Sequence, residues 1–353
     1  MVKNIYLCSL EERVGKTLLS IGLIQYLQNQ GKKVAYFKPI GIPKAAFSNK
    51  ADVDVGFIQN SVLKEVIPYD ITSPVSIPDS YYIDLIDRDI KEDYLDKIKK
   101  AYEVISKDFD YVVIEGAPSI RKFIRVGIDD ISIAQKLGIE ELIVVNCESS
   151  DRCIDNLYFT KNYFDYRNMK IKGIIFNLID HEYIARIEEL EENNIKRYGI
   201  PVLGIVEKSY VLYSPRVLEI LGSIGGELLN EGATSGLNNN VEHYIIGAMN
   251  VQAALKYLRQ VKNFAFITGG DRSDLILAAL NEDVAVIILT GYIIPDTKII
   301  TAATEKGVPI ILSPSDTYTT MRNIDRIKPG LQSDEIQIIH DLIEKSLDWD
   351  KIL

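Results

Sequence analysis

The sequence predicts an α/β protein in which parallel strands alternate with helices, divided into a larger and a smaller domain. Short runs of apolar, β-branched residues recur along the chain, and most of them precede a stretch with helical spacing. The 353 residues and 47 % hydrophobic content allow two ordinary domains, each with its own core. We therefore expect parallel sheets with helices on both faces.

Six apolar runs in the first half are the expected strands of the larger sheet. Each run is nearly uninterrupted by polar residues, as strands covered on both faces should be. They are Asn4–Cys8, Lys33–Phe37, Tyr111–Glu115, Leu142–Asn146, Ile171–Asn177 and Val202–Val206. We assign residues 1–208 to this first domain.

A polar break and a turn-rich patch after residue 206 indicate the domain boundary. The stretch Ser214–Leu229 between them is amphipathic. The second domain, residues 211–328, repeats the alternation with expected strands at Tyr244–Met249, Phe264–Thr268, Val284–Leu289 and Pro309–Leu312. Residues 331–353 read as one amphipathic C-terminal helix.

Composition excludes several partner classes. The net charge of −10 opposes nucleic acid and anionic membrane surfaces, so we expect neither as a partner. No apolar run is long enough to span a bilayer and no leader precedes the first strand, which indicates a cytoplasmic protein. Three cysteines and three histidines show no zinc-site spacing.

A glycine-lysine-threonine turn follows the first expected strand and opens the helical run Leu18–Leu27. Walker A loops have the pattern G-x-x-x-x-G-K-[ST], in which backbone N–H groups and the lysine hold phosphates and the hydroxyl binds Mg²⁺. Here Leu10 replaces the first glycine, and Glu11 adds negative charge nearby. We predict that this loop binds ATP and Mg²⁺ through Glu12, Arg13, Val14, Gly15, Lys16, Thr17 and Leu18. The alternative is an ordinary helix start.

Two motifs resemble the dethiobiotin synthetase-like branch of P-loop proteins: Val14-Gly15-Lys16-Thr17 after an acidic segment, and Phe37-Lys38-Pro39-Ile40. The same module begins many long phosphotransacetylases, where a DRTGG domain follows it. The second half is similar to that domain at residues 245–249, 268–274 and 288–291. The resemblance implies a P-loop NTPase-type sheet followed by a smaller α/β DRTGG domain. Without the acetyltransferase domain, the chain is not expected to be a phosphotransacetylase by itself.

The resemblance also implies a magnesium site. Its ligands would be the P-loop hydroxyl of Thr17, either Asp52 or Asp54, and Glu115. Glu115 ends an apolar run and precedes a glycine, so its carboxylate is expected at the carboxyl edge of the sheet. The alternatives are a solvent-facing turn carboxylate for Glu115 and a helix cap for either aspartate.

Two further residues receive roles from the resemblance. Lys38 matches a lysine that meets the substrate or its phosphorylated intermediate, so Lys16, Lys38 and Glu115 are the catalytic candidates. Asn177 resembles an asparagine that recognises adenine, since an amide offers one donor and one acceptor. A strand-ending asparagine in a turn is the simpler alternative.

In the second domain, polar residues gather at the ends of three expected strands. The turn Gly269-Gly270 precedes a helical run that an anion could approach, although Asp271 or Ser273 could equally cap that helix. A small-molecule effector site at this edge is plausible in an open sheet. The DRTGG resemblance also implies a homo-oligomer, with the apolar face of Glu335–Leu347 as a second candidate contact.

Three functions fit these features. The leading hypothesis is a regulatory or sensor ATPase whose nucleotide state is coupled to the DRTGG domain. The second is an ATP-dependent ligase that activates a small carboxylate or carbamate, with Lys38 steering the anion. The third is a non-enzymatic scaffold with a vestigial P-loop.

Overall fold

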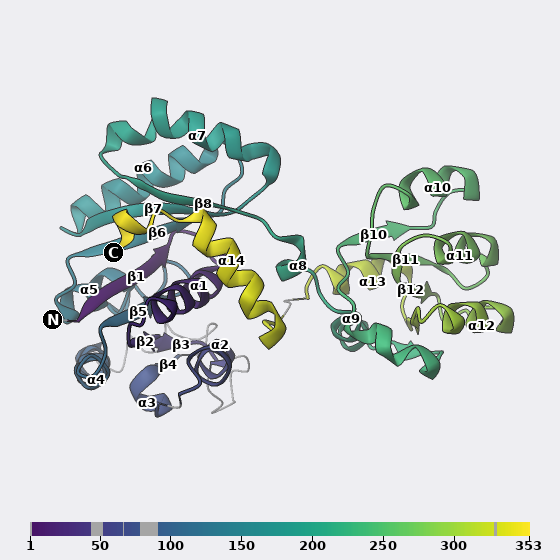
Figure 1. Cartoon of the computed structure of the whole chain (residues 1–353), viewed down its shortest axis with the longest axis horizontal. Helices are drawn as coiled ribbons and strands as arrows, with labels where there is room; N and C mark the ends of the chain where they lie inside the picture. The colour runs from purple at the N-terminus through teal and green to yellow at the C-terminus, as the bar shows by residue number, and fades with distance from the viewer. Residues whose placement is uncertain (1, 44–51, 66, 78–90, 328–329) are drawn as a thin grey trace. The chain divides into compact units, whose positions relative to one another are not determined.

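The computed structural model describes residues 2–43, 52–65, 67–77, 91–327 and 330–353 (Figure 1). The chain divides into two units. Unit 1 contains Met1–Lys208 and Gln332–Leu353, and unit 2 contains Ser209–Leu331. Both are α/β units, which confirms the predicted fold class. Residue 328, the predicted end of the second domain, lies outside the described residues.

Unit 1 is built on a sheet of six parallel strands in the order β2-β5-β1-β6-β7-β8. All six expected strands are present, with ends that differ by a few residues. Their bounds are β1 Lys3–Ser9, β2 Val34–Phe37, β5 Tyr111–Glu115, β6 Glu141–Asn146, β7 Lys170–Ile179 and β8 Val202–Glu207. A separate two-stranded sheet pairs β3 (Ile40–Gly41) with β4 (Val75–Ser76).

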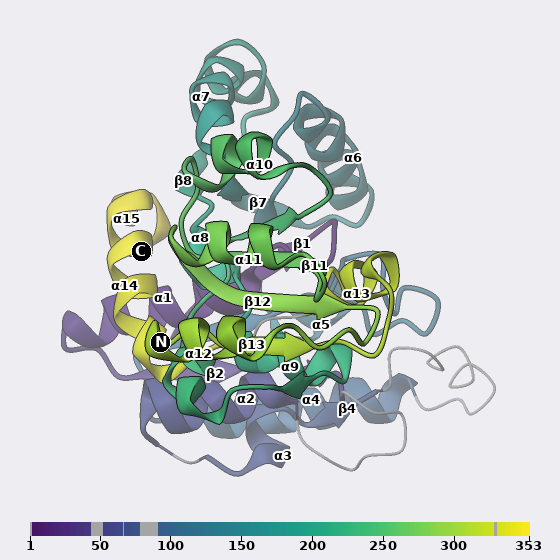
Figure 2. The same ribbon diagram turned by 90° about the vertical axis from the view of Figure 1, so that its right-hand side faces the viewer.

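Helices cover both faces of the large sheet (Figures 1 and 2). They are α1 Lys16–Asn29, α2 Val53–Phe57, α3 Tyr69–Thr72, α4 Lys91–Ile105, α5 Asp130–Leu137, α6 Arg152–Tyr166, α7 Ile184–Asn193, α14 Ile336–Ser346 and α15 Trp349–Ile352. This two-sided cover explains the continuous apolar strands, such as β5, all of whose residues are buried.

The C-terminal segment, residues 332–353, belongs to unit 1, and it contains α14 and α15 in place of the one helix predicted for residues 331–353. Helix α14 packs on α1, and Ile339 and Ile343 are fully buried there. Gly22 of α1 provides the room, because a Cβ at this position would lie 2.5 Å from Ile343. The apolar face predicted to contact another copy is thus covered within the same chain. Helix α1 is apolar on several sides because the sheet and α14 each cover one.

Polar and aromatic contacts fix the tail further. The rings of Tyr26 and Trp349 stack with centroids 3.4 Å apart. The amide of Asn29 lies 2.9 Å from Nε2 of His340. The backbone N–H of Asp348 donates to the carbonyl of Leu203 in β8. Residues 332–353, which we call the tail, therefore contact both α1 and strand β8 of the sheet.

Unit 2 holds a five-stranded sheet in the order β10-β11-β12-β13-β9, parallel except for β9. The strands are β9 Glu227–Leu228, β10 His243–Ile246, β11 Phe264–Gly269, β12 Val284–Thr290 and β13 Ile310–Leu312. The helices are α8 Tyr210–Tyr213, α9 Val217–Ile224, α10 Val251–Leu258, α11 Ser273–Leu280, α12 Thr297–Glu305 and α13 Thr317–Ile324.

The amphipathic stretch Ser214–Leu229 contains α9 and β9. Helix α9 ends at Ile224, and Gly225 adopts a left-handed φ of 60°. That glycine terminates the helix and lets the chain turn into β9. Among the described residues, no helix has the length and apolar character needed to cross a membrane.

The packing of the tail on α1 generates a first prediction. Ile343→Ala should lower the free energy of unfolding of unit 1 by about 2–5 kcal/mol, because it leaves a cavity over Gly22. Ile338→Ala is the matched control on the same helix, since Ile338 is 42 % exposed. Urea denaturation measures both. Equal losses in the two variants would contradict the packing.

Candidate functional site

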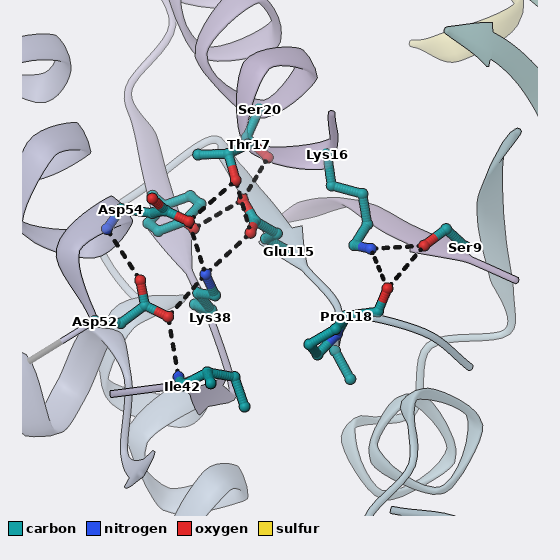
Figure 3. A network of polar contacts seen from close by, with 12 residues as sticks. Ser9, Lys16, Thr17, Ser20, Lys38, Ile42, Asp52, Asp54, Glu115 and Pro118 are labelled. Atoms are coloured by element: carbon teal, nitrogen blue, oxygen red, sulfur yellow. Dashed lines mark hydrogen bonds and ion pairs between the residues drawn. The ribbon is translucent and has the colours of Figure 1, made fainter. Parts of the chain in front are cut away.

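Three neighbouring strands deliver polar residues to one edge of the unit 1 sheet. The order β2-β5-β1 places the ends of these strands side by side, with Leu7 of β1 paired to Glu115 of β5. Lys38 follows β2, Glu115 ends β5, and the loop after β1 leads into α1 at Lys16. Because carboxyl ends of parallel strands share one edge, residues from three distant segments meet there (Figure 3).

The loop before α1 turns through left-handed backbone conformations. Arg13 has a φ of 59° and Gly15 a φ of 79°. Gly15 is the N-cap, and no side chain caps the helix. The N–H groups of the first turn therefore lack a side-chain acceptor, and they carry the positive end of the helix dipole. This arrangement suits an anion.

Lys16 lies beneath this loop with its ammonium held inside the protein. Its Nζ donates to Oγ of Ser9 at 2.6 Å and to the carbonyl of Pro118 at 3.0 Å. Burial lowers the pKa of Lys16, while the charges of Asp130 and Glu115 oppose that shift. The two acceptors are neutral, so the positive charge remains available to an anionic ligand.

A cluster of three carboxylates surrounds the ammonium of Lys38. Its Nζ lies 2.9 Å from Oδ2 of Asp52, 3.4 Å from Oδ2 of Asp54 and 3.1 Å from Oε1 of Glu115 (Figure 3). Burial alone would lower the pKa of Lys38, but the charges of Glu115, Asp52 and Asp54 hold it above its usual value. Lys38 is therefore charged. We call these four residues the carboxylate cluster.

Thr17 joins the carboxylate cluster to the P-loop. Its Oγ1 donates to Oε1 of Glu115 at 3.1 Å and lies 3.3 Å from Oδ2 of Asp54. Glu115 is buried, so the alternative of a solvent-facing turn carboxylate is wrong for this structure. The hydroxyl and the carboxylates form a set of hard oxygen donors, which is the donor chemistry that Mg²⁺ prefers. The residues present fit that ion.

The two aspartates that the sequence left undecided play different parts. Asp52 is buried and is the N-cap of α2, where it accepts from the N–H of Asp54, and it also accepts from Ile42. The side chain of Asp54 is 43 % exposed. Asp52 is thus both a cap and a buried member of the carboxylate cluster, and Asp54 is a partly exposed member whose Oδ2 contacts Lys38 and Thr17.

Asn177 lies at the back of the P-loop. It is fully buried, and its Nδ2 donates to the carbonyl of Val14 at 2.7 Å. Its Oδ1 has no hydrogen-bond partner among the described residues. The role of Asn177 in adenine recognition stays a prediction, and it requires this side chain to exchange its present hydrogen bond for one to a base.

The acidic residues of the loop are paired with cations. Glu11 lies 3.7 Å from Arg121, and Glu12 lies 2.9 Å from Lys122. Both cations come from the segment after Glu115. The negative charge near the expected phosphates is therefore partly neutralised, which weakens one of the two arguments for a vestigial loop, the other being Leu10 in place of the first glycine.

Sequence reasoning missed several residues that support the site. Tyr36 donates to Oε2 of Glu115 at 3.0 Å, and Ser20 lies 3.5 Å from the same oxygen. Asp130 is fully buried, and its Oδ1 accepts from Tyr6 and from the N–H of Ala117. Only Tyr36 had a signal, since it lies two residues before Lys38 in a buried strand.

At the carboxyl edge of unit 2, hydroxyl groups pair mostly with one another. The Oγ1 atoms of Thr290 and Thr317 lie 2.8 Å apart, and Oγ1 of the buried Thr268 has no hydrogen-bond partner among the described residues.

Helix α11 has Arg272 at its N-cap position and no side-chain cap. The interpretation of Asp271 or Ser273 as its cap is therefore wrong.

The comparisons with known families agree with this division. The profile of the AAA domain family matches residues 3–216, and that of the DRTGG domain matches residues 219–327. The first match covers more than half of the chain. The predicted combination of a P-loop domain and a DRTGG domain is confirmed.

Curated relatives include long phosphate acetyltransferases, as the resemblance implied. The phosphate acetyltransferase of Synechocystis is 26 % identical over 100 % of this chain and 52 % of its own length. That of Escherichia coli is 22 % identical over 94 % of this chain and 49 % of its own. The chain spans about half the length of the curated relatives it matches.

Solved structures show more distant similarity. Cobyrinic acid a,c-diamide synthase from Mycobacterium smegmatis, with bound ADP and magnesium, is 19 % identical and covers 59 % of this chain and 88 % of its own, with a TM-score of 0.37. The CBS and DRTGG domains of Clostridium perfringens pyrophosphatase are 16 % identical and cover 53 % and 72 %, with a TM-score of 0.31. Scores of this size support no functional inference.

Asp130 generates a pH prediction. Burial raises the pKa of Asp130 to about 6, although the N–H of Ala117 and the charge of Lys16 oppose the shift. Ionising this carboxyl in the folded protein therefore costs stability, and the cost is absent below its unfolded pKa and complete above about pH 6. As pH rises from 4 to 7, the free energy of unfolding of Asp130→Asn should increase by about 2–3 kcal/mol relative to that of wild type, as measured by urea denaturation. If the free energies of unfolding of the two proteins changed in parallel with pH, the raised pKa of Asp130 would be contradicted.

Proposed function

Because the chain belongs to the AAA domain family, we propose that unit 1 binds ATP with Mg²⁺ and that its nucleotide state regulates the DRTGG domain of unit 2. Slow hydrolysis of ATP would reset this state. The observation that supports the proposal best is the meeting of Lys16, Thr17 and Glu115 at the start of an uncapped helix. We place this function in the cytoplasm.

Each residue of the proposed nucleotide site has a defined task. Backbone N–H groups of residues 12–18 would hold the phosphates, with Lys16 contributing a positive charge. Thr17 and the carboxylates of Asp52, Asp54 and Glu115 would hold Mg²⁺, which neutralises phosphate charge when bound. Asn177 would contact the base after releasing Val14.

The route of coupling would run through α1. This helix begins at Lys16, within the P-loop, and its later turns contact the tail through Gly22, Tyr26 and Asn29. The tail follows unit 2 in the chain, so unit 2 is connected to unit 1 at both of its ends. A shift of α1 on nucleotide binding would therefore act on the second connection directly.

Unit 2 would respond to this signal and to a second ligand. We propose a small-molecule effector site at its carboxyl edge, near the unpartnered hydroxyl of Thr268. Exposed apolar residues gather in the loop after β12, where Tyr292, Ile293 and Ile294 are all exposed. They would favour self-association, so we propose a homo-oligomer formed through unit 2.

The regulatory reading is preferred over the ligase reading because of Lys38. Lys38 contacts three carboxylates, so it could steer an anionic substrate only after its ammonium had left them. The two cations that follow Glu115 and lie near the P-loop are already paired, Arg121 with Glu11 and Lys122 with Glu12.

ATP binding is tested by calorimetric titration of wild type and Lys16→Ala with ATP and Mg²⁺. A charge-assisted lysine–phosphate contact contributes roughly 2–3 kcal/mol, so the variant should bind about 30- to 100-fold more weakly. Lys32→Ala, an exposed lysine just beyond α1, is the matched control and should bind as wild type does. Absence of binding by wild type in the millimolar range would end the proposal.

The coupling is tested by hydrogen exchange with and without ATP and Mg²⁺. Amides of α1 and α14 should exchange more slowly with nucleotide bound, and amides of unit 2 should change as well. Lys16→Ala should abolish these changes at the same nucleotide concentration. Changes confined to the P-loop and the segment after Glu115 would refute the coupling while leaving ATP binding intact.

A further inference from the structure

The ammonium of Lys38 occupies the point on which the oxygen donors of the site converge. Oδ2 of Asp54 and Oε1 of Glu115 each contact two groups, the Nζ of Lys38 and the Oγ1 of Thr17. Oδ2 of Asp52 completes the set at 2.9 Å from Nζ (Figure 3). A cation that used these oxygens and the Thr17 hydroxyl together would have to stand in or beside the position of Nζ.

We propose that Lys38 is the resident cation of the nucleotide-free site and that a divalent metal ion enters only by displacing its ammonium. This inference rests on the proposed binding of Mg²⁺ and adds the state that precedes it. Lys38 thereby acts as a positioning residue that keeps the carboxylates assembled before the metal ion arrives.

Charge and burial argue for exchange rather than for sharing. Lys38 is 8 % exposed and Glu115 only 4 %, so their charges are poorly screened by water. An ammonium and a divalent ion on the same oxygens would repel each other strongly in such surroundings. The flexible stem of a lysine lets the ammonium move. Asp52 is held by the N–H groups of Ile42 and Asp54, and Glu115 is held by the hydroxyl of Tyr36.

The exchange also links metal entry to the nucleotide. A displaced ammonium needs a new anionic partner, and the phosphates of a bound nucleotide would provide one at this edge of the sheet. A metal ion arriving without nucleotide offers no such partner. We therefore expect weak metal binding by the free protein and tight binding of the metal–nucleotide pair.

The test is a titration of the nucleotide-free protein with Mn²⁺. Binding is measured as the decrease in the electron paramagnetic resonance signal of unbound Mn²⁺. Lys38→Met keeps an unbranched stem and removes the ammonium with its charge, and this variant should bind Mn²⁺ at least roughly tenfold more tightly than wild type. Lys16→Met is the matched control: it also removes a buried lysine charge, but Lys16 donates to Ser9 and Pro118 and contacts no carboxylate. Its effect should be much smaller.

Equal Mn²⁺ affinities of wild type and Lys38→Met, or equal gains in the two methionine variants, would overturn the proposal. Because no nucleotide is present, failure of ATP binding would not affect this result. A protein that binds ATP but shows no gain in Lys38→Met would refute the exchange alone.

A second pair of variants covers the case in which Lys38→Met does not fold. Asp54→Asn removes the most exposed carboxylate, and adding Lys38→Met restores the net charge that the cluster has in wild type. The double variant should bind Mn²⁺ at least roughly tenfold more tightly than Asp54→Asn alone. Equal affinities of these two proteins would also overturn the proposal.

Discussion

The site of unit 1 depends on one electrostatic constraint: buried carboxylates must be brought together where β2 and β5 end. Asp52 and Glu115 are both nearly inaccessible to water, and burying two such charges without a partner would be very costly. Lys38 supplies the partner from the adjacent strand end. The same ammonium connects the end of β2 to α2 through Asp52 and to β5 through Glu115, and Thr17 adds the start of α1 through its hydrogen bond to Glu115.

The fold could be predicted wherever both faces of an element are buried, because such elements are continuously apolar in sequence. Continuous apolar runs identified the six strands of unit 1, because helices cover both faces of its sheet. Strand β9 was missed because two residues at a sheet edge carry no pattern, and Gly225 and β13 decide its place. Amphipathicity indicated that α14 needs a partner but not which one. The apolar character of α1 on more than one side was the signal for that partner.

The site residues could be predicted where the spacing of residues along the chain is enough to identify them. Lys16 and Thr17 follow from the loop pattern, and Glu115 follows from its place at a strand end. The ion pairs of Lys38 depend on three segments meeting, which no local pattern contains. Asn177 was predicted to end its strand, but β7 continues to Ile179, and the side chain turns inward to Val14, because side-chain direction is set by packing.

The tail has a consequence for how the protein is made. The P-loop, the sheet and α1 are synthesised first. Helix α14, whose Ile343 covers α1 at Gly22, is synthesised only after all of unit 2. At ordinary elongation rates that delay is on the order of ten seconds, during which the apolar flank of α1 around Gly22 is without its cover. Unit 2 can complete its own folding in that interval. The packing of α14 on α1 therefore forms only after unit 2 has been synthesised.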